Sequence, residues 1–238
     1  MQGALRTYAV ACFAILLSAC GGGNNTAAPS PTSNFDLQTG IAKMVTNGLS
    51  ANVSLSGSVS VNGVSTAFTG SGTFTRAPAV SATFNGTAAS SQTTTVAGTI
   101  TAAGQSAPYS ASVTDYYASS DGAFLGEASG SEYDVAQTPF QFPNMVVGGS
   151  SGTLGTLSRY TDSTMSVPLG DAQVSYFVTA PADPGSPISV AVTTKIYDTQ
   201  NALTETDVTN YTMTSSSVIS LSAASAQNQT GTLSVTAQ

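Results

Sequence analysis

From Leu49 to the C-terminus, apolar side chains recur at every second position, and this period constrains the fold more than any other feature. In the first such run, Val53, Leu55, Val59 and Val61 are separated by serine and other small residues. Because successive side chains of a β-strand point to opposite faces, this period predicts half-buried strands. Continuous βαβ patterns do not occur in the sequence, so the strands are expected to be antiparallel neighbours joined by short turns.

The turns between these runs carry the residues that tight hairpins require. Asn62-Gly63 separates two alternating runs, which is the strongest short-range signal of a β-hairpin, and Asn85-Gly86 and Asp121-Gly122 repeat the pattern. Further strands are expected around residues 93–101, 107–117, 123–135, 153–160, 165–168, 172–180, 187–197, 204–213, 217–224 and 230–236. The sequence therefore predicts an all-β fold, an antiparallel meander of about 11–12 strands.

A meander of this length has to protect the edges of its sheet. We expect a curled half-barrel or a barrel-like sheet that covers one short N-terminal helix, and a two-sheet sandwich is the alternative. Residues 138–152 interrupt the alternation and are interpreted as a long crossing between two halves of a single domain spanning residues 34–238. A weak similarity between residues 96–117 and 190–211 is compatible with an internal duplication.

The one helix is predicted over residues 35–47. Leu37, Ile41, Met44 and Val45 fall at i, i+4, i+7 and i+8, on one face of a 3.6-residue period. This spacing predicts that Ile41 and Met44 are buried. A strand over the same residues is the alternative interpretation.

Polar residues around this segment support a helix with one exposed face. Asn34 can cap the start and Gly48 lies just past the end, while Gly40 in the middle weakens the helix by about 1 kcal/mol relative to alanine. Lys43 and Gln38 fall off the apolar stripe, so they are expected to remain in water.

Residues 1–19 have the pattern of an export signal, in which Arg6 precedes an apolar run of about ten residues. The four residues Leu17-Ser18-Ala19-Cys20 resemble the bacterial lipobox. This resemblance implies that the Cys20 thiol receives a diacylglyceryl group, that a signal peptidase cuts before Cys20, and that the new N-terminus is acylated. The alternative is an ordinary secretory signal in which a cysteine happens to follow.

Residues 20–33 are expected to form the lipidated cysteine and a flexible tether. They contain Gly, Asn, Thr, Ala, Pro and Ser, and beyond Cys20 nothing apolar larger than alanine. In the sorting pattern of bacterial lipoproteins, a residue other than aspartate after the cysteine implies the outer membrane, and Gly21 stands there. The membrane partner would be held by the acyl chains on Cys20. Whether the domain faces the periplasm or the cell surface is left open.

The rest of the chain is similar to uncharacterised β-rich lipoproteins of Gram-negative bacteria. The similarity is carried by the Cys-Gly-Gly-Gly run at 20–23, the Gly-Ser-Gly-Thr-Phe-Thr run at 70–75, and Gly-Thr-Leu-Gly at 152–155 before Tyr-Thr-Asp-Ser at 160–163. No activity is attached to this resemblance, so Cys20 is the only functional residue that it implies.

Composition excludes several classes of function. The chain of 238 residues has only five Lys and Arg against twelve Asp and Glu, a net charge of −7, so no basic patch exists to bind nucleic acid. Histidine is absent, which excludes a Ser-His-Asp triad and the usual ligands of zinc and haem. We therefore expect no cofactor and no metal site.

The remaining candidates for catalysis are weak. Gly148–Gly152 matches the nucleophile-elbow pattern G-x-S-x-G, but no helix is expected after it and no histidine can activate the serine. A Ser-Lys dyad has only Lys43 and Lys195 to draw on, and neither follows a serine by three residues. Lys195 is interpreted as an outward-facing charge on a strand.

Carboxylates form two groups, Glu127 with Glu132 and Asp134, and Glu205 with Asp207. Either group could act as general acid and base or hold Ca²⁺, but on exposed strand faces such residues usually repel each other and stay solvated, and we expect the latter. Eight tyrosines recur along the strands and are interpreted mainly as core. They are Tyr109, Tyr116, Tyr117, Tyr133, Tyr160, Tyr176, Tyr197 and Tyr211. The adjacent pair at 116 and 117 has to point to opposite faces.

These observations favour a non-enzymatic protein. A binding module that holds a hydrophobic or amphiphilic ligand inside the curved sheet is the first hypothesis, because curved sheets and barrel mouths offer concave apolar sites. A structural or adhesive protein of the cell envelope, with another envelope protein as its partner, is the second. An enzyme using carboxylates is the third.

Overall fold

The structure is a computed structural model that describes residues 34–181, 183 and 185–238, so Cys20, the predicted export signal and the predicted tether lie outside the described residues. The described residues form one helix and fifteen strands: β1 (Phe35–Asp36), α1 (Leu37–Asn47), β2 (Leu49–Val61), β3 (Val64–Arg76), β4 (Val80–Phe84), β5 (Thr87–Ala102), β6 (Gln105–Ala118), β7 (Phe124–Ser129), β8 (Tyr133–Phe140), β9 (Met145–Val146), β10 (Ser151–Tyr160), β11 (Pro168–Thr179), β12 (Ile188–Tyr197), β13 (Leu203–Met213), β14 (Ile219–Asn228) and β15 (Gly231–Ala237).

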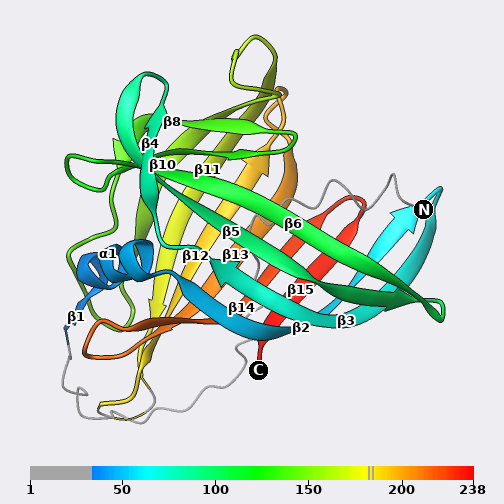
Figure 1. Cartoon of the computed structure of the whole chain (residues 1–238), viewed down its shortest axis with the longest axis horizontal. Coiled ribbons are helices and arrows are strands. Elements are labelled where there is room, and N and C mark those ends of the chain that lie inside the picture. Colours follow the sequence, from blue (N-terminus) through cyan, green and yellow to red (C-terminus); the bar gives the residue numbers. More distant parts are fainter. Residues whose placement is uncertain (1–33, 182, 184) are drawn as a thin grey trace, which may run out of the picture.

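The long strands close into an antiparallel barrel (Figure 1). Consecutive strands pair with each other, the first barrel strand β2 pairs with the last strand β15, and β3 pairs with β5. The short strand β4 pairs only with the start of β5, so the described residues form a twelve-strand barrel with one extra strand. The all-β, barrel-like prediction is confirmed, and the two-sheet sandwich is wrong because one sheet closes on itself.

The segment over residues 138–152 connects neighbouring strands. It joins β8 to β10, which pair directly along Tyr133–Ala136 and Leu157–Tyr160. It is therefore a loop within one sheet and not a crossing between two sheet halves. Within it, β9 forms a small separate ladder with β1. The single strand expected over 123–135 is a hairpin of two strands, β7 and β8.

Two of the three predicted hairpin turns have the backbone conformation that their residues favour, whereas Asp121-Gly122 lies in a longer loop between β6 and β7, in which Gly122 has a positive φ of 73° and Asp121 does not. Asn62 and Gly63 have φ values of 52° and 78°, as a type I′ turn requires, and Asn85 and Gly86 have 48° and 76°. A third turn of the same geometry joins β5 to β6 at Ala103-Gly104, with φ values of 48° and 76°. The alanine there explains why the sequence did not signal this turn.

Helix α1 begins two residues later than predicted. Phe35 and Asp36 are extended and pair with β9, and the Asp36 carboxylate caps the helix by accepting a 2.9 Å hydrogen bond from the Thr39 amide. Asn34 is thus not the cap. A Cβ atom at Gly40 would lie 3.0 Å from side-chain atoms of Ile219 and of Met213. Close packing against β13 and β14 therefore accounts for a glycine in the middle of the helix.

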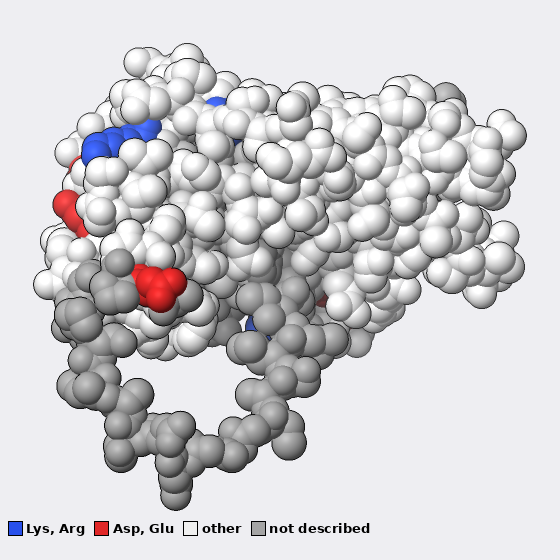
Figure 2. Space-filling view, turned by 90° about the horizontal axis from the view of Figure 1, so that it is seen from below, with Lys and Arg blue, Asp and Glu red and all other residues white. Residues whose placement is uncertain are grey.

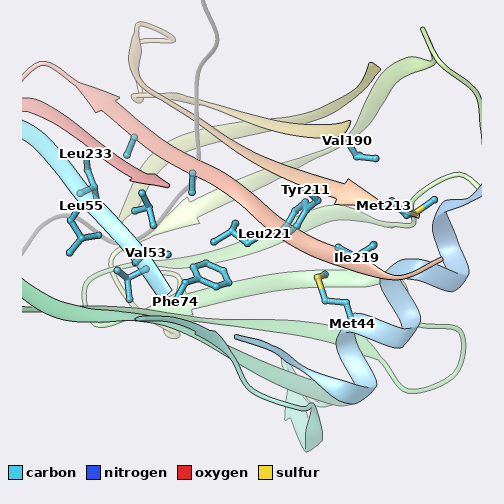
Figure 3. Close-up of a cluster of buried hydrophobic side chains, with 14 of the residues drawn as sticks. Met44, Val53, Leu55, Phe74, Val190, Tyr211, Met213, Ile219, Leu221 and Leu233 are labelled. Carbon is cyan, nitrogen blue, oxygen red and sulfur yellow. The ribbon is translucent and has the colours of Figure 1, made fainter. Parts of the chain in front are cut away.

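The largest apolar cluster joins α1 to the barrel interior (Figure 3). Met44 points toward Ile219, and the interior side chains of β2, β3, β13, β14 and β15 continue the cluster along the barrel. Leu37 and Met44 are buried, Ile41 and Gln38 are half-buried, and Lys43 is exposed. The prediction is confirmed for Met44 and Lys43, whereas Ile41 is less buried than predicted and Gln38 is less exposed, because it donates a 2.7 Å hydrogen bond to Gln141. Within the described part of the chain, no helix is long and apolar enough to cross a membrane.

The outside of the barrel carries few charges. The face shown in Figure 2 has only small groups of charged side chains on its described surface. Both arginines of the described residues, Arg76 and Arg159, are buried, and so are Asp115, Asp134 and Asp207. A chain that is poor in charge has therefore placed much of its charge inside the barrel.

Truncating the helix side chain that is most deeply buried tests the packing of α1. Leu37→Ala is expected to lower the free energy of unfolding by about 2–5 kcal/mol, because it removes a fully buried side chain and leaves a cavity. Lys43→Ala is expected to cost less than about 0.5 kcal/mol, as is usual for a surface change. Urea midpoints measure both, and equal shifts would contradict the packing of α1 described here.

Candidate functional site

A cavity of about 130 Å³ lies inside the barrel beside α1. Its apolar wall comes from the helix and from strands on several sides of the barrel, and includes Ile41, Met44, Phe74, Phe124, Phe140 and Leu157. Its polar wall includes Thr94, Thr194, Thr209, Arg76, Asp115 and Glu127. The cavity therefore offers both an apolar surface and a set of polar groups.

Two glycines allow the aromatic rings to reach this cavity. The β6–β7 ladder shifts register near Gly126, so that Phe124 and Glu127 both face the interior although they are three residues apart. A Cβ atom at Gly126 would lie 2.1 Å from the Asp134 carbonyl oxygen. Likewise, a Cβ atom at Gly155 would lie 2.2 Å from the ring of Phe140. Glycine is needed at both positions for close approach.

The first polar cluster surrounds Arg76 at the end of β3. The guanidinium forms an ion pair with Asp115 and donates hydrogen bonds to Tyr117 Oη at 2.7 Å and to Gln92 Oε1 at 2.6 Å. Burial raises the pKa of the Asp115 carboxyl, and the charge of Arg76 lowers it. Tyr117 is fully enclosed, and burial raises the pKa of its phenol far above the ordinary value.

Gln92 connects this cluster to the helix. Its Nε2 donates to the backbone carbonyls of Met44 at 3.0 Å, Val45 at 3.2 Å and Ala77 at 2.8 Å. Two of these carbonyls belong to the last turn of α1, whose C-terminal carbonyls have no partner within the helix. A fully buried glutamine therefore holds the C-terminus of α1 against the Arg76 cluster.

A row of charged side chains crosses four neighbouring strands. Asp115 of β6 pairs with Glu127 of β7, Glu127 pairs with Asp134 of β8, and Asp134 pairs with Arg159 of β10. Directly paired residues share a face of the sheet, so all four side chains point into the barrel. Arg159 forms ion pairs with Asp134 at 3.3 Å and with Glu132 at 2.5 Å.

Burial makes ionisation less favourable for the carboxyl groups of this row. Burial raises the pKa of Glu127 well above its usual range, and the charges of Asp134 and Asp115 raise it further. Burial also raises the pKa of Asp134 to about 7, while Arg159 lowers it. Glu127 is only half-buried by surface area because it borders the cavity.

Asp207 and Glu205 extend the acidic region from β13. Asp207 has 0% of its surface exposed, and its carboxyl group is hydrogen-bonded to that of Glu205. Burial raises its pKa well above the usual range, and the charges of Glu205 and Glu127 add to this. Glu205 accepts a 3.3 Å hydrogen bond from Asn228, and burial raises its pKa as well.

The structure thus overturns the expectation that these carboxylates lie on exposed strand faces. Asp134 and Asp207 are buried inside the barrel, and Glu127 lines the cavity. A signal for this was present on β13. Glu205 and Asp207 share their strand face with Tyr211, which was expected to be core, and that face is the inner one. Arg76 and Gln92 were not predicted as site residues, because no local sequence pattern distinguishes an interior arginine or glutamine from an exposed one.

The other sequence candidates lie away from the cavity. Ser150 is in the turn before β10, where its hydroxyl accepts a 3.0 Å hydrogen bond from the Val147 amide. Lys195 is exposed, as expected for an outward-facing residue. Tyr117 points inward, while Tyr116 stacks on Phe84 at a centroid distance of 4.5 Å. The expected opposite orientation of the two adjacent tyrosines is confirmed.

Comparison with known proteins adds little to this geometry. No family model matches the chain, and no curated protein matches it. Among solved structures, it is similar to a DUF1329 family protein from Desulfovibrio piger at 8% identity and a TM-score of 0.24, over 85% of this chain and 91% of that one. A TM-score this low carries no argument. In the described part of the chain, no three acidic or cysteine side chains are grouped so that they could hold a metal ion.

The raised pKa values predict how stability depends on pH. The folded state retains protons on Asp207, Glu127 and Asp134 that the unfolded chain releases from about pH 4 upward. The contribution of these groups to stability is therefore full below about pH 4 and is lost as pH rises through their folded values, which for Asp134 is about 7.

Asp207→Asn removes the most deeply buried of these ionisable groups. It is expected to raise the free energy of unfolding at pH 8 by on the order of 1 kcal/mol or more, and to have a much smaller effect at pH 4.5. Urea midpoints at the two pH values measure the difference, with the exposed Asp183→Asn as the control. An equal loss of stability at both pH values would contradict the assignment.

Proposed function

We propose that this protein is a non-catalytic binding module that holds a small amphiphilic molecule inside its barrel. The cavity between α1 and the strands carries this proposal, because it combines an apolar wall with polar groups that converge on the same space. Closed barrels commonly hold one small ligand in their interior.

The size of the cavity limits the ligand. About 130 Å³ is close to the volume of an engineered protein cavity of about 150 Å³ that binds benzene, and below the roughly 300–1,000 Å³ of drug-sized pockets. The apolar part of the ligand is therefore about the size of one six-membered ring. A whole lipid acyl chain is larger than this volume.

An unused polar group in the wall supports an amphiphilic ligand over a purely apolar one. The Thr94 hydroxyl lines the cavity and is buried, yet it has no hydrogen-bond partner within the described residues. Native proteins rarely leave such groups without a partner, since burial of an unpaired polar atom costs about 1–3 kcal/mol. A ligand hydroxyl or amine in the cavity would supply the missing partner.

Binding of a ring-sized probe tests the proposal. Benzyl alcohol is expected to shift the methyl NMR signals of Ile41 and Leu157, which line the cavity, and to leave that of Val64, on the outer surface, unchanged. Val113→Phe should abolish the shifts, because Val113 lines the cavity and a larger side chain would fill it. Ser112→Phe, exposed on the outer face of the same strand, is the matched control.

Failure of every ring-sized probe would overturn this proposal. If benzyl alcohol, benzylamine and benzoate all leave the cavity methyl signals unchanged, a structural or adhesive role in the cell envelope becomes the better hypothesis. Native mass spectrometry of the purified chain provides a second test, in which a co-purified small molecule lost in Val113→Phe but retained in Ser112→Phe would support binding.

We also propose that the binding module is anchored to the outer membrane through Cys20. The support is the sequence alone, in the lipobox-like Leu17–Cys20 and in Gly21 after the cysteine. Acyl chains stabilise membrane binding by about 0.8 kcal/mol for each buried CH₂, so three chains anchor a protein in effect permanently. The anchor would hold the barrel at the membrane and leave its interior free to bind.

Replacement of the anchor residue tests this second proposal. Cys20→Ser is expected to give an uncleaved or soluble form, because serine cannot form the thioether. Intact-mass measurement of the membrane-extracted protein should show the added acyl mass on the wild type. Absence of acyl mass on Cys20 would contradict the anchor and leave the binding proposal unaffected.

A further inference from the structure

The charges inside the barrel do not balance. Among the described residues, the ion pairs of the interior join Arg76 to Asp115 and Arg159 to Glu132 and Asp134. Three further carboxyl groups belong to the same region and take part in none of these ion pairs: Glu127, Glu205 and Asp207. The interior therefore holds more carboxyl groups than its two arginines neutralise.

Asp207 is the most deeply buried of these three carboxyl groups. It has no exposed surface, where an ionised carboxyl group would cost several kcal/mol, and it is hydrogen-bonded to Glu205. It pairs across the ladder with Thr194 and shares its strand face with Thr209, and both threonines line the cavity. Asp207 itself therefore lies behind the cavity wall and adds to the acidic surroundings of the cavity.

Glu127 brings a second carboxyl group into the cavity itself. It is one of the lining residues, and its charge is felt at Asp207. Phe124 and Phe140 line the same space, and the faces of aromatic rings attract cations. The cavity thus joins an aromatic surface to a carboxyl group that takes part in none of the ion pairs of the interior.

We propose that the molecule held in this cavity is an organic cation, whose ammonium group binds Glu127 while its apolar part packs on Phe124 and Phe140. This inference rests on the proposed binding function and names the class of ligand. A neutral ligand would leave Glu127 without a counter-charge, and an anion would meet the carboxyl groups of Asp115 and Glu127 in the wall. A bare metal ion fits less well, because hard cations want six to eight oxygens and much of this wall is apolar.

The experiment compares three probes that share one ring and differ in charge. Benzylamine, benzyl alcohol and benzoate are titrated into the full chain by isothermal calorimetry at pH 7. Benzylamine is expected to bind about ten- to a hundredfold more tightly than benzyl alcohol, as one hydrogen-bonded ion pair provides, and benzoate to bind most weakly. Burial and the charges of Asp134 and Asp115 raise the pKa of Glu127, so benzylammonium should also displace a proton, seen as a heat that changes with the buffer.

Two isosteric variants assign the residues. Glu127→Gln is expected to weaken benzylamine about tenfold or more and to change benzyl alcohol less than about threefold. Asp207→Asn, behind the cavity wall, is expected to change either probe less than about threefold. Asp183→Asn, which removes an exposed carboxylate, is the matched control and should change neither. A urea midpoint for each variant at pH 7 shows that it is folded.

The outcomes separate this inference from the proposed function. If benzyl alcohol or benzoate binds the cavity as tightly as benzylamine, the cationic ligand is wrong and the binding module stands. If benzylamine binds best but Glu127→Gln does not weaken it, the assignment of this carboxyl group is overturned. If none of the three probes binds, the proposed function fails and the inference fails with it.

Discussion

The pairing of β2 with β15 joins the beginning of the sheet to its end, and the rest of the architecture depends on this closure. Closure removes the edges that would otherwise recruit other chains, and it fixes which face of every strand is inside. It also creates an interior that the strands alone do not fill. About eight strands give a barrel that side chains can just fill, and this barrel has twelve.

The additional space is occupied by helix α1, by phenylalanine side chains and by charged side chains. Helix α1 places Leu37 and Met44 against β13 and β14, and the phenylalanines of β3, β7 and β8 project inward from the strands. Charged side chains of β3, β6, β8 and β10 fill much of the remainder with ion pairs. Buried ion pairs contribute little to stability compared with apolar packing of the same volume, so a barrel selected for stability alone would not need them. Their presence beside the cavity favours a role in recognition.

Much of the fold follows from the sequence, because its signals are local. A two-residue period and dipeptides such as Asn62-Gly63 specify strands and turns whatever the remainder of the chain does. The turn at Ala103-Gly104 escaped this reasoning, since alanine seldom adopts a positive φ. The start of α1 escaped it as well, because the pairing of Phe35 with Val146 is a contact between distant parts of the chain.

The site was less predictable for a physical reason. Strands such as β13 have threonine on both faces, so a period of two shows that the faces differ without showing which is inside. The positions of Tyr211 and Met213 fix the inner face of β13, and Asp207 lies on that face against the usual preference of aspartate for water. The inner face of β13 could have been assigned from its aromatic and apolar residues. Asp207, which shares that face, would then have been placed inside the barrel, and the acidic region would have been located.

Helix position and cavity chemistry are connected by an unbroken chain of hydrogen bonds. Gln92 donates to the carbonyls at the end of α1 and accepts from Arg76, and Arg76 in turn pairs with Asp115 in the cavity wall. Ile41 and Met44 of the same helix form part of that wall. Because low dielectric strengthens each of these bonds, displacement of α1 would break several interactions at once and leave Arg76 and Gln92 with fewer partners. The helix is therefore held in place by the same polar groups that border the cavity. This network sets the size of the cavity as much as the strands do.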